Sequence, residues 1–384
     1  MTAHFWLSTK AITLTQDSIG AMTDDQARMF LAELRWGSAD QQVCPECGAV
    51  DRHYHIRTRR QWRCKHCFHT FSVTSGTPFA DRKIGYRKLL LALFAFVINQ
   101  KGIAALALRR IIGGQYRTSF TLLHKLREAI MLTTSQDQLE GVVEIDGGHF
   151  SGRKRKGRKK KKAKEENKQV PNKYAQHRSK ASQGAFPFHP NRRIIIVLRE
   201  ISQETTGAIN KYNGKPIGKG ATRTIVAVCR SENNVDVEAL IRKHVAVPST
   251  IRTDEMPSYG NVKLMGYTHQ VVNHSVEFSS DEGYNENQAE SYFSRMRRAC
   301  IGIYHRITPK YMLDYASETA WREDVRRQDT RSQLAMLVQR VFSAGLSKDW
   351  LNYCHGNHRQ VELLFQGPRK GVNELNSSPA PQAS

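Results

Sequence analysis

Two cysteine pairs constrain the fold of this chain more than any other feature. The stretches CPECG and CKHC place Cys44, Cys47, Cys64 and Cys67 in the pattern C-x2-C, sixteen residues, C-x2-C. Two thiolates two residues apart can bind one metal ion from a tight turn, and two such turns complete a closed tetrahedral site. The spacing predicts one structural zinc ion (Zn²⁺) in a zinc ribbon. The alternative is four unrelated free cysteines.

The segment between the cysteine pairs, VDRHYHIRTRRQWR, alternates aromatic, basic and polar residues as a hairpin does. Basic and aromatic side chains on such a surface suit contact with DNA phosphates. The residues predicted to make this contact are Arg57, Arg59, Arg60, Trp62 and Arg63. The alternative is a ribbon that only folds the N-terminal part of the chain or binds another protein.

The net charge favours a polyanionic partner. The 384 residues contain 59 Lys and Arg against 35 Asp and Glu, which gives a formal charge of +24. A charge of this size opposes compaction unless a partner balances it, so nucleic acid is the expected partner and an anionic membrane surface the weaker one. No apolar run approaches the roughly 18 residues of a membrane span. Because the first residues lack a signal-peptide pattern, we expect a cytoplasmic, reduced protein without a membrane partner.

Hydrophobic periodicity predicts several domains. Helical patterns occupy the N-terminal third, and strand patterns begin near residue 141 and then alternate with helices, which indicates a mixed α/β domain. The predicted organisation is a helical segment (1–40), a zinc ribbon (41–80), a helix-turn-helix domain (81–135), an α/β domain (140–327) with a basic insertion (151–191), and a C-terminal helix with a disordered tail (328–384).

Helix-turn-helix spacing is present in the stretch GIAALALRRIIGGQYRTSFTLLHKLREAI. A helix is followed by a glycine turn and by a second helix that starts near Arg117. Arg117, Thr118 and Ser119 then lie at the start of a candidate recognition helix that contacts DNA. The alternative is plain packing, because any small helical bundle has a similar pattern.

Three carboxylates stand apart by their context. Asp146 ends the strand pattern VVEID, Asp254 ends STIRTD, and Glu290 lies at the start of a helix pattern. The ends of such strands border the crevice of an α/β sheet. Converging carboxylates repel one another unless cations neutralise them, and oxygen ligands select Mg²⁺ or Mn²⁺. Two such ions can catalyse displacement at phosphorus. For any single acid the alternative is a solvated or ion-paired side chain.

From about residue 22 to residue 327 the chain resembles the bacterial insertion-sequence transposases that carry an N-terminal zinc ribbon and a DDE-type catalytic domain of ribonuclease-H-like fold. The resemblance rests on the order of CPECG…CKHCFHTFSVTSGTPF, VEIDGGHF, IRTDEMPSY and NENQAESYFSRMRRACIGIYHRITPKYM. The 36 residues from Asp254 to Glu290 match the usual spacing of such enzymes.

The resemblance implies that Asp146, Asp254 and Glu290 bind two catalytic Mg²⁺ or Mn²⁺ ions. Asn287 occupies a place at which related proteins have asparagine, so the third ligand is Glu290 or Asn287, and Glu290 is favoured because its charge helps to hold two cations. Arg297 lies two helical turns beyond Glu290 and is predicted to contact DNA near the scissile phosphate, His305 is predicted to approach the site, and Arg298 is a further predicted DNA contact. A structural role for His305 is the alternative.

Two departures from the family pattern concern the first aspartate and the region after it. Members often have an acid directly after that aspartate, and this chain has Gly147. The following region is longer and more basic than usual. As an arm along DNA it would neutralise phosphates; a solvated loop or a localisation tag is the alternative. The residues assigned to this arm are Arg153, Lys154, Arg155, Lys156, Arg158, Lys159 and Lys160.

The resemblance implies a nucleoid-associated bacterial transposase. It would bind the terminal inverted repeats and target DNA as double strands, cleave at the transposon ends and join the 3′-hydroxyl ends to target DNA. Joining two ends in one event requires at least a homodimer. The alternatives are a non-catalytic DNA-binding regulator and a ribonuclease-H-like nuclease without strand transfer. LFQGP near the C-terminus resembles an engineered protease site, so the last residues carry no functional weight.

Overall fold

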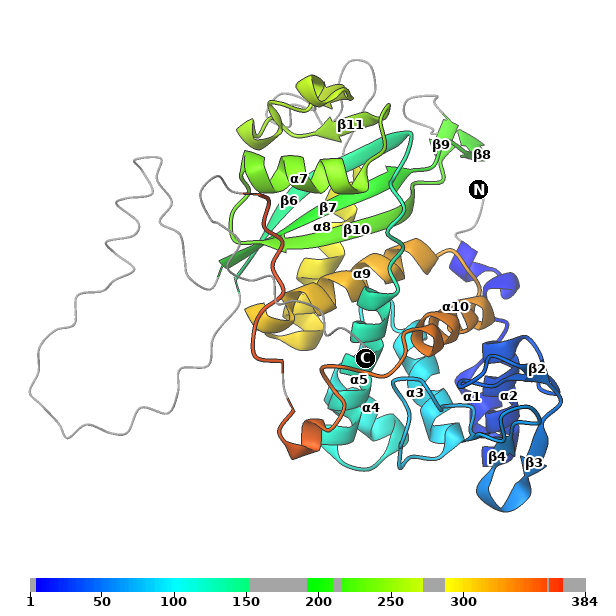
Figure 1. The fold of residues 1–384 in the computed structure, drawn as a ribbon. Helices are drawn as coiled ribbons and strands as arrows, with labels where there is room; N and C mark the ends of the chain where they lie inside the picture. Colours follow the sequence, from blue (N-terminus) through cyan, green and yellow to red (C-terminus); the bar gives the residue numbers. More distant parts are fainter. Residues whose placement is uncertain (1–4, 152–191, 210–215, 272–286, 358, 369–384) are drawn as a thin grey trace, which may run out of the picture.

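The computed structural model describes residues 5–151, 192–209, 216–271, 287–357 and 359–368. Six helices form a helical unit that contains the chain's N-terminal third and one C-terminal helix (Figure 1). Its helices are α1 (Gln16–Gly20), α2 (Asp24–Trp36), α3 (Tyr86–Ile98), α4 (Ala105–Ile112), α5 (Tyr116–Leu132) and α10 (Thr330–Ser343). The start of α2 is capped, because the Thr23 hydroxyl and the Gln26 side chain form a reciprocal capping box.

The zinc ribbon contains five short strands. They are β1 (Gln42–Val43), β2 (Val50–Asp51), β3 (Tyr54–Ile56), β4 (Gln61–Arg63) and β5 (Thr70–Phe71). β1 pairs with β2, and β3, β4 and β5 form an antiparallel sheet. The Trp62 ring packs between Trp36 of α2 and Phe71 of β5, with ring centroids 5.4 and 6.1 Å apart. This aromatic cluster joins the ribbon to the helical unit.

A mixed five-stranded sheet is the centre of the second half of the chain. Its order is β10-β7-β6-β11-β12, in which β7 is antiparallel to both neighbours and β6, β11 and β12 are parallel. The strands are β6 (Val142–Ser151), β7 (Arg192–Ile201), β10 (Ala221–Cys229), β11 (Thr250–Thr253) and β12 (Thr268–Val271). A separate hairpin of β8 (Thr205–Ile209) and β9 (Pro216–Gly218), which the sequence patterns do not predict, precedes β10.

Helices cover both faces of this sheet (Figure 1). Along β7, Ile194, Ile196 and Leu198 face α7 (Asn234–His244), whereas Ile195 and Val197 face α8 (Asn287–Ala299) and α9 (Met312–Val325). A strand that is buried on both faces reads as a continuous apolar run, which explains the stretch RRIIIVLREI. The sheet therefore has two cores, one on each side.

The helical unit and the sheet domain are joined through α5, α9 and α10. α10 packs against α2, α3 and α5, so a helix that follows the sheet domain in sequence completes the N-terminal core. Between α5 and α9, Arg127 donates to Glu318 at 2.6 Å, and both side chains are 2% exposed. Arg322 binds the same carboxylate from the next turn of α9. This buried ion pair holds the two parts of the chain together.

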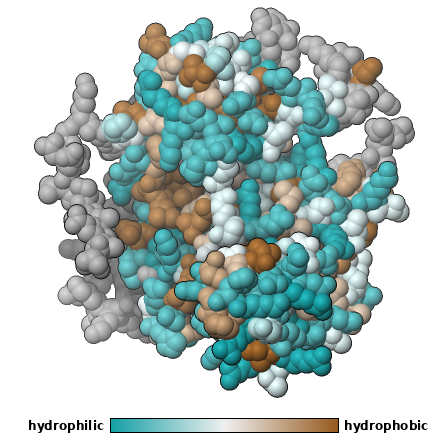
Figure 2. All heavy atoms as spheres, turned by 45° about the vertical axis from the view of Figure 1, so that its right-hand side comes forward, coloured by the Kyte–Doolittle hydropathy of each residue, from teal (hydrophilic) through white to brown (hydrophobic). Residues whose placement is uncertain are grey.

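The surface is predominantly polar. The face drawn in Figure 2 is largely hydrophilic, with its apolar residues gathered in separate patches. Among the described helices, none has the length and apolar composition needed to cross a membrane.

Candidate active site

The sheet brings Asp146 and Asp254 to the same level on neighbouring strands. In the parallel pair β6–β11, Thr250, Ile251 and Arg252 pair with Val142, Val143 and Glu144. Continuing this register by two residues sets Asp254 opposite Asp146. One expectation is corrected, because β6 does not end at Asp146 but pairs with β7 as far as Ser151. Asp146 instead lies two residues beyond Glu144, the last residue of β6 that pairs with β11.

Helix α8 crosses β6 on the face that carries the side chain of Asp146. The Glu144 carboxylate accepts hydrogen bonds from the first amides of α8, Gln288 N at 3.0 Å and Ala289 N at 3.2 Å. Four residues further along β6, a Cβ on Gly148 would overlap the Phe293 ring of α8. Because alternate residues of a strand share a face, Asp146 lies between these two anchor points. Its carboxylate therefore faces the helix that carries Glu290.

Two further contacts fix the start of α8. Arg199 of β7, which is 1% exposed, donates to the carbonyl of Gln288 at 2.5 Å and pairs with Glu323 of α9 at 3.5 Å. Burial raises the pKa of Glu144 to about 7, although the amide hydrogen bonds from α8 oppose this shift. The sheet thus supplies both an anion and a cation to hold the helix terminus that carries Glu290.

Backbone contacts orient the two aspartates, and Glu290 is exposed. Asp146 accepts a hydrogen bond from Gly147 N at 2.6 Å, and Asp254 accepts one from Met256 N at 3.1 Å. Glu290 lies in the first turn of α8 with its side chain exposed to solvent. A carboxylate in this position is stabilised by the helix dipole. Asn287 is the first residue of α8, but its side chain lies outside the described part of the structure.

A fourth carboxylate, which the sequence patterns do not single out, lies beside this group. Glu232 follows β10, and its Oε1 accepts a hydrogen bond from the Tyr259 hydroxyl at 2.8 Å. Burial raises the pKa of Glu232 to about 7, and the negative charges of Asp146 and Asp254 contribute to the same shift. Burial, with Glu232 and the same two aspartates, also raises the pKa of Tyr259. The side chains of Glu232, Tyr259, Asp146 and Asp254 therefore belong to one electronegative region.

The donor set of this region fits hard divalent cations, since it is composed of carboxylate oxygens. The carboxylates are less tightly gathered than the ribbon cysteines. In the described ranges, only the four cysteines form a group of three or more potential ligands whose donor atoms all lie within 4.8 Å. The mutual charge of Asp146, Asp254 and Glu232 is nevertheless what a bound cation would neutralise. Asp146 and Asp254 are the side chains that would hold it.

The four cysteines fit a tetrahedral zinc ion. The Sγ atoms of Cys44 and Cys67 are 3.6 Å apart, as are those of Cys47 and Cys64. Thiolates that each lie about 2.3 Å from a central ion are separated by roughly this distance. The alternative of four unrelated cysteines is therefore excluded for this region, because all four donors converge on one point.

Some of the ribbon and α5 side chains that are predicted to contact DNA are exposed, and others are buried. Trp62 and Ser119 are 3% and 0% exposed, so neither can reach a nucleic acid in this fold, and both predictions are corrected. Trp62 packs the ribbon onto α2, and Ser119 lies on the buried face of α5. The exposed members are Arg57, Arg59, Arg60, Arg63, Arg117 and Thr118.

The basic residues of α8 lie on the same side of the sheet as Asp146. Arg297 is exposed and stacks its guanidinium 5.6 Å from the centre of the Phe293 ring, which itself covers Gly148. Burial lowers the pKa of His149 of β6, and the positive charges of Arg192 and Arg297 lower it further. Arg298 and His305 are also exposed. The basic arm predicted at Arg153–Lys164 falls outside the described residues.

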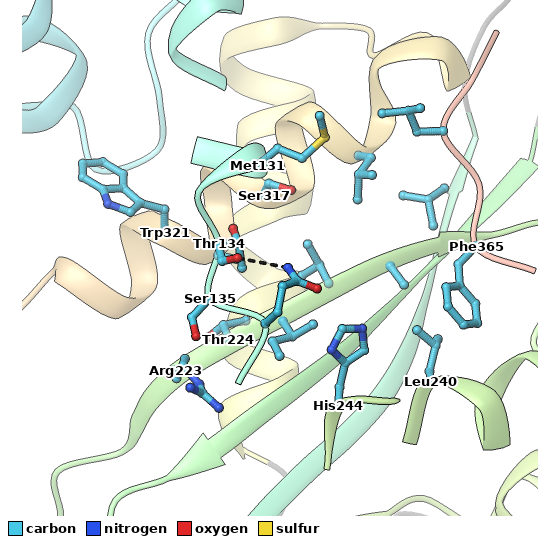
Figure 3. Close-up of a pocket in the computed structure, with 18 of the residues that line it drawn as sticks. Met131, Thr134, Ser135, Arg223, Thr224, Leu240, His244, Ser317, Trp321 and Phe365 are labelled. Carbon is cyan, nitrogen blue, oxygen red and sulfur yellow. Dashed lines mark hydrogen bonds between the residues drawn. The ribbon is translucent and has the colours of Figure 1, made fainter. Parts of the chain in front are cut away.

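A separate pocket is lined by residues other than these carboxylates. Its volume is about 410 Å³, and it lies between β10, α7, α9 and the segment Glu362–Phe365. Figure 3 shows His244, Ser317 and Phe365 around it. None of Asp146, Asp254, Glu290 and Glu232 lines this pocket.

Comparison with known families agrees with this division of the chain. Residues 22–70 match a transposase zinc-ribbon domain, and residues 138–324 match an ISXO2-like transposase domain. The chain belongs to the insertion-sequence transposases that combine an N-terminal zinc ribbon with a DDE-type domain. Within that class, both matching models describe the IS1595 family. No curated protein matches the chain.

Proposed function

We propose that this transposase cleaves DNA at the ends of its mobile element and joins the freed 3′-hydroxyl groups to target DNA, with Asp146, Asp254 and Glu290 as the catalytic carboxylates. The observation that carries the proposal is the geometry of the sheet edge. The register of β6 and β11 supports the alignment of the two aspartates, and the contacts of α8 with Glu144 and Gly148 support a place for its first turns, which carry Glu290, over the same strand. The mixed sheet supports the ribonuclease-H-like fold that the family implies.

In the proposed mechanism, Asp146 and Asp254 hold Mg²⁺ or Mn²⁺, and Glu290 of α8 completes the site. Bound ions of this kind activate an attacking oxygen and stabilise the leaving oxygen at phosphorus. The protein's own residues position the DNA: Arg297 and Arg298 are exposed two turns along α8 from Glu290 and contact the strand beside the cut. Asn287 supports Glu290 or replaces it as ligand. Cleavage and joining use the same site in succession, without a covalent enzyme intermediate.

DNA recognition is assigned to the ribbon and to the start of α5. Arg57, Arg59, Arg60 and Arg63 are exposed around one hairpin of the ribbon. Gly113 and Gly114, both with positive φ, form the turn between α4 and α5 and leave Arg117 exposed at the start of α5. We propose that α4 and α5 act as a helix-turn-helix on the terminal repeats. We also propose that two copies of the chain act together, because two ends are joined in one event.

The test is an assay with full-length protein, Mg²⁺ and DNA that carries the terminal repeats flanking the coding sequence. We expect strand cleavage followed by a joined product. Asp146→Asn, Asp254→Asn and Glu290→Gln should each reduce cleavage to background while end-DNA binding without metal persists. The matched control is Glu255→Gln, which changes an exposed acid next to Asp254 and should cleave as the unaltered protein does. Cleavage at unaltered rates by all three site variants would refute the assignment.

The same assay separates the two other functions that the sequence leaves open. A protein that binds the repeats but cleaves nothing is a regulator. Cleavage without any joined product indicates a nuclease. The proposed function requires both products.

A further inference from the structure

Glu232 is a carboxylate at the catalytic edge of the sheet that the proposed mechanism does not use. It lies between the end of β10 at Cys229 and the N-cap of α7 at Asn233. β10 runs parallel to β6, so Glu232 emerges at the same edge as Asp146 and Asp254. Its side chain lies on the α7 side of the sheet, opposite to α8.

Two contacts fix the Glu232 carboxylate in place. The first is the 2.8 Å hydrogen bond from Tyr259, whose side chain is 1% exposed and lies five residues after Asp254. The second is close packing on the backbone of Gly147, where a Cβ atom would overlap the carboxylate. Glu232 therefore touches the strand directly after Asp146 and binds the segment directly after Asp254. It connects the two segments of the sheet that carry the aspartates.

We infer that Glu232 is a positioning residue for the divalent-cation site of Asp146 and Asp254. Held by Tyr259 against Gly147, it fixes the two segments that carry the aspartates relative to each other and adds negative charge beside them. The inference rests on the proposed function of the two aspartates. Gly147 is part of the same arrangement, since any other residue at this position would displace the carboxylate. The glycine that departs from the family pattern thus has a physical reason in this chain.

A role in folding alone does not explain the charge of Glu232. A neutral glutamine would also accept the Tyr259 hydrogen bond, although less strongly than a carboxylate does. Burial and the two neighbouring aspartates oppose the ionised form of Glu232, so the carboxylate is costly to the unliganded protein. A bound divalent cation would offset that cost, because it attracts all three carboxylates. The position therefore suits a charge that acts on the cation through Asp146 and Asp254.

The experiment compares Glu232→Gln, which removes the charge and keeps an acceptor, with Tyr259→Phe, which keeps the charge and removes the hydrogen bond. Mn²⁺ binding is measured by electron paramagnetic resonance on full-length protein without DNA, and cleavage of end DNA is measured against Mg²⁺ concentration. We expect Glu232→Gln to weaken Mn²⁺ binding about tenfold and to raise the half-saturating Mg²⁺ concentration by a similar factor. Tyr259→Phe should shift both in the same direction by less. High Mg²⁺ should restore cleavage.

The matched control is Glu238→Gln. Glu238 of α7 also binds the segment after Asp254, because it accepts a hydrogen bond from Asn261 Nδ2 at 2.7 Å. The charges that shift the pKa values of Glu232 and Tyr259 come from other residues. The Glu238→Gln variant should bind Mn²⁺ as the unaltered protein does. If Glu232→Gln should fail to fold, Tyr259→Phe still tests the inference, because the loss of one hydroxyl leaves the packing of the ring in place.

Asp254→Asn distinguishes the failure of this inference from the failure of the proposed function. If Asp254→Asn loses Mn²⁺ binding and cleavage while Glu232→Gln and Tyr259→Phe change neither, the inference alone is refuted. If Asp254→Asn retains both, the proposed site is refuted and the inference is refuted with it. A Glu232→Gln protein that loses stability but keeps the unaltered half-saturating Mg²⁺ concentration also refutes the inference, since it shows a purely structural role.

Discussion

At the scale of single residues, two successive glycines determine what can approach β6, the strand that carries Asp146. Gly147 and Gly148 point to opposite faces of β6, as neighbours in a strand do. The Glu232 carboxylate occupies the space beside Gly147, and the Phe293 ring occupies the space beside Gly148. Either side chain would collide with a Cβ atom. The two glycines thus allow a carboxylate and a helix to reach the backbone on either side of Asp146.

Gly148→Ala should destabilise the sheet domain and displace α8. The added methyl group overlaps an aromatic ring that is 1% exposed and has no free space to move into. Overpacking of this kind costs about 1–3 kcal/mol, which urea unfolding should detect. Cleavage should fall with stability, because Phe293 and Glu290 belong to the same helix. Gly302→Ala is the control, since nothing lies within 4 Å of its Cβ position. Equal stability of both variants would contradict this account.

At the scale of elements, the zinc ribbon depends on its ligands more than on its own core. Its five strands are two or three residues long, and such strands have little cooperative stability without a further constraint. The aromatic cluster of Trp36, Trp62 and Phe71 supplies some apolar burial. The four converging cysteines supply the remaining constraint. Ribbon folding and metal binding should therefore be one event.

Removal of zinc should unfold the ribbon and leave the sheet domain folded. Cys47→Ser should lower the zinc content, measured by atomic absorption, and make the segment 41–71 sensitive to proteolysis. Binding of end DNA should weaken with it, because the exposed arginines lose their common scaffold. The matched control is Cys354→Ser, which replaces an exposed cysteine far from the ribbon in sequence. A Cys47→Ser protein that keeps one zinc ion and resists proteolysis would contradict the assignment.

At the scale of the whole molecule, buried charges connect the helical unit to the sheet domain. Arg127 of α5 binds Glu318 of α9 and lies 4.1 Å from the centre of the Tyr315 ring. Glu318 also accepts hydrogen bonds from Arg322 and from the Tyr304 hydroxyl. The two arginines lower the pKa of Glu318, although its burial opposes this shift. The connection is polar and specific, so it sets one relative orientation of the two parts.

Glu318→Gln should destabilise the whole chain by about 3–5 kcal/mol, because it leaves Arg127 and Arg322 buried without their shared anion. Urea unfolding measures this loss. The additional replacement of Arg127 by Met should recover part of it, since one unpaired charge is removed. Glu33→Gln is the control for a surface pair: Glu33 binds Arg331 at 2.9 Å, both side chains are about half exposed, and little change is expected. If the stability losses of the two single replacements simply add in the double variant, the residues do not form a coupled network.

Local sequence patterns predict much of the fold correctly. The helix that starts near Arg117 and the strands of the second half of the chain lie where the periodicity indicates. The hairpin of β8 and β9 was missed. The family and the cysteine ligands were also accessible from sequence, because both depend on residue types at fixed spacings. The catalytic roles of Asp146, Asp254 and Glu290 remain predictions.

Patterns could not give the exposure of individual side chains or contacts between distant segments. Trp62 and Ser119 have residue types that suit DNA contact, yet both are buried by elements elsewhere in the chain. Glu232 has no motif around it, and its role depends on Tyr259 and Gly147, which lie 27 and 85 residues away.

The sequence by itself determined the zinc ligands, the α/β character of the second half and the family, since these follow from spacing and periodicity along the chain. Only the tertiary structure decided that α10 completes the N-terminal core and that Glu232 lies beside the two aspartates. The physical reason is that packing and electrostatic interactions act through space. Residues without any relation in sequence are brought together by strand register and by helix packing.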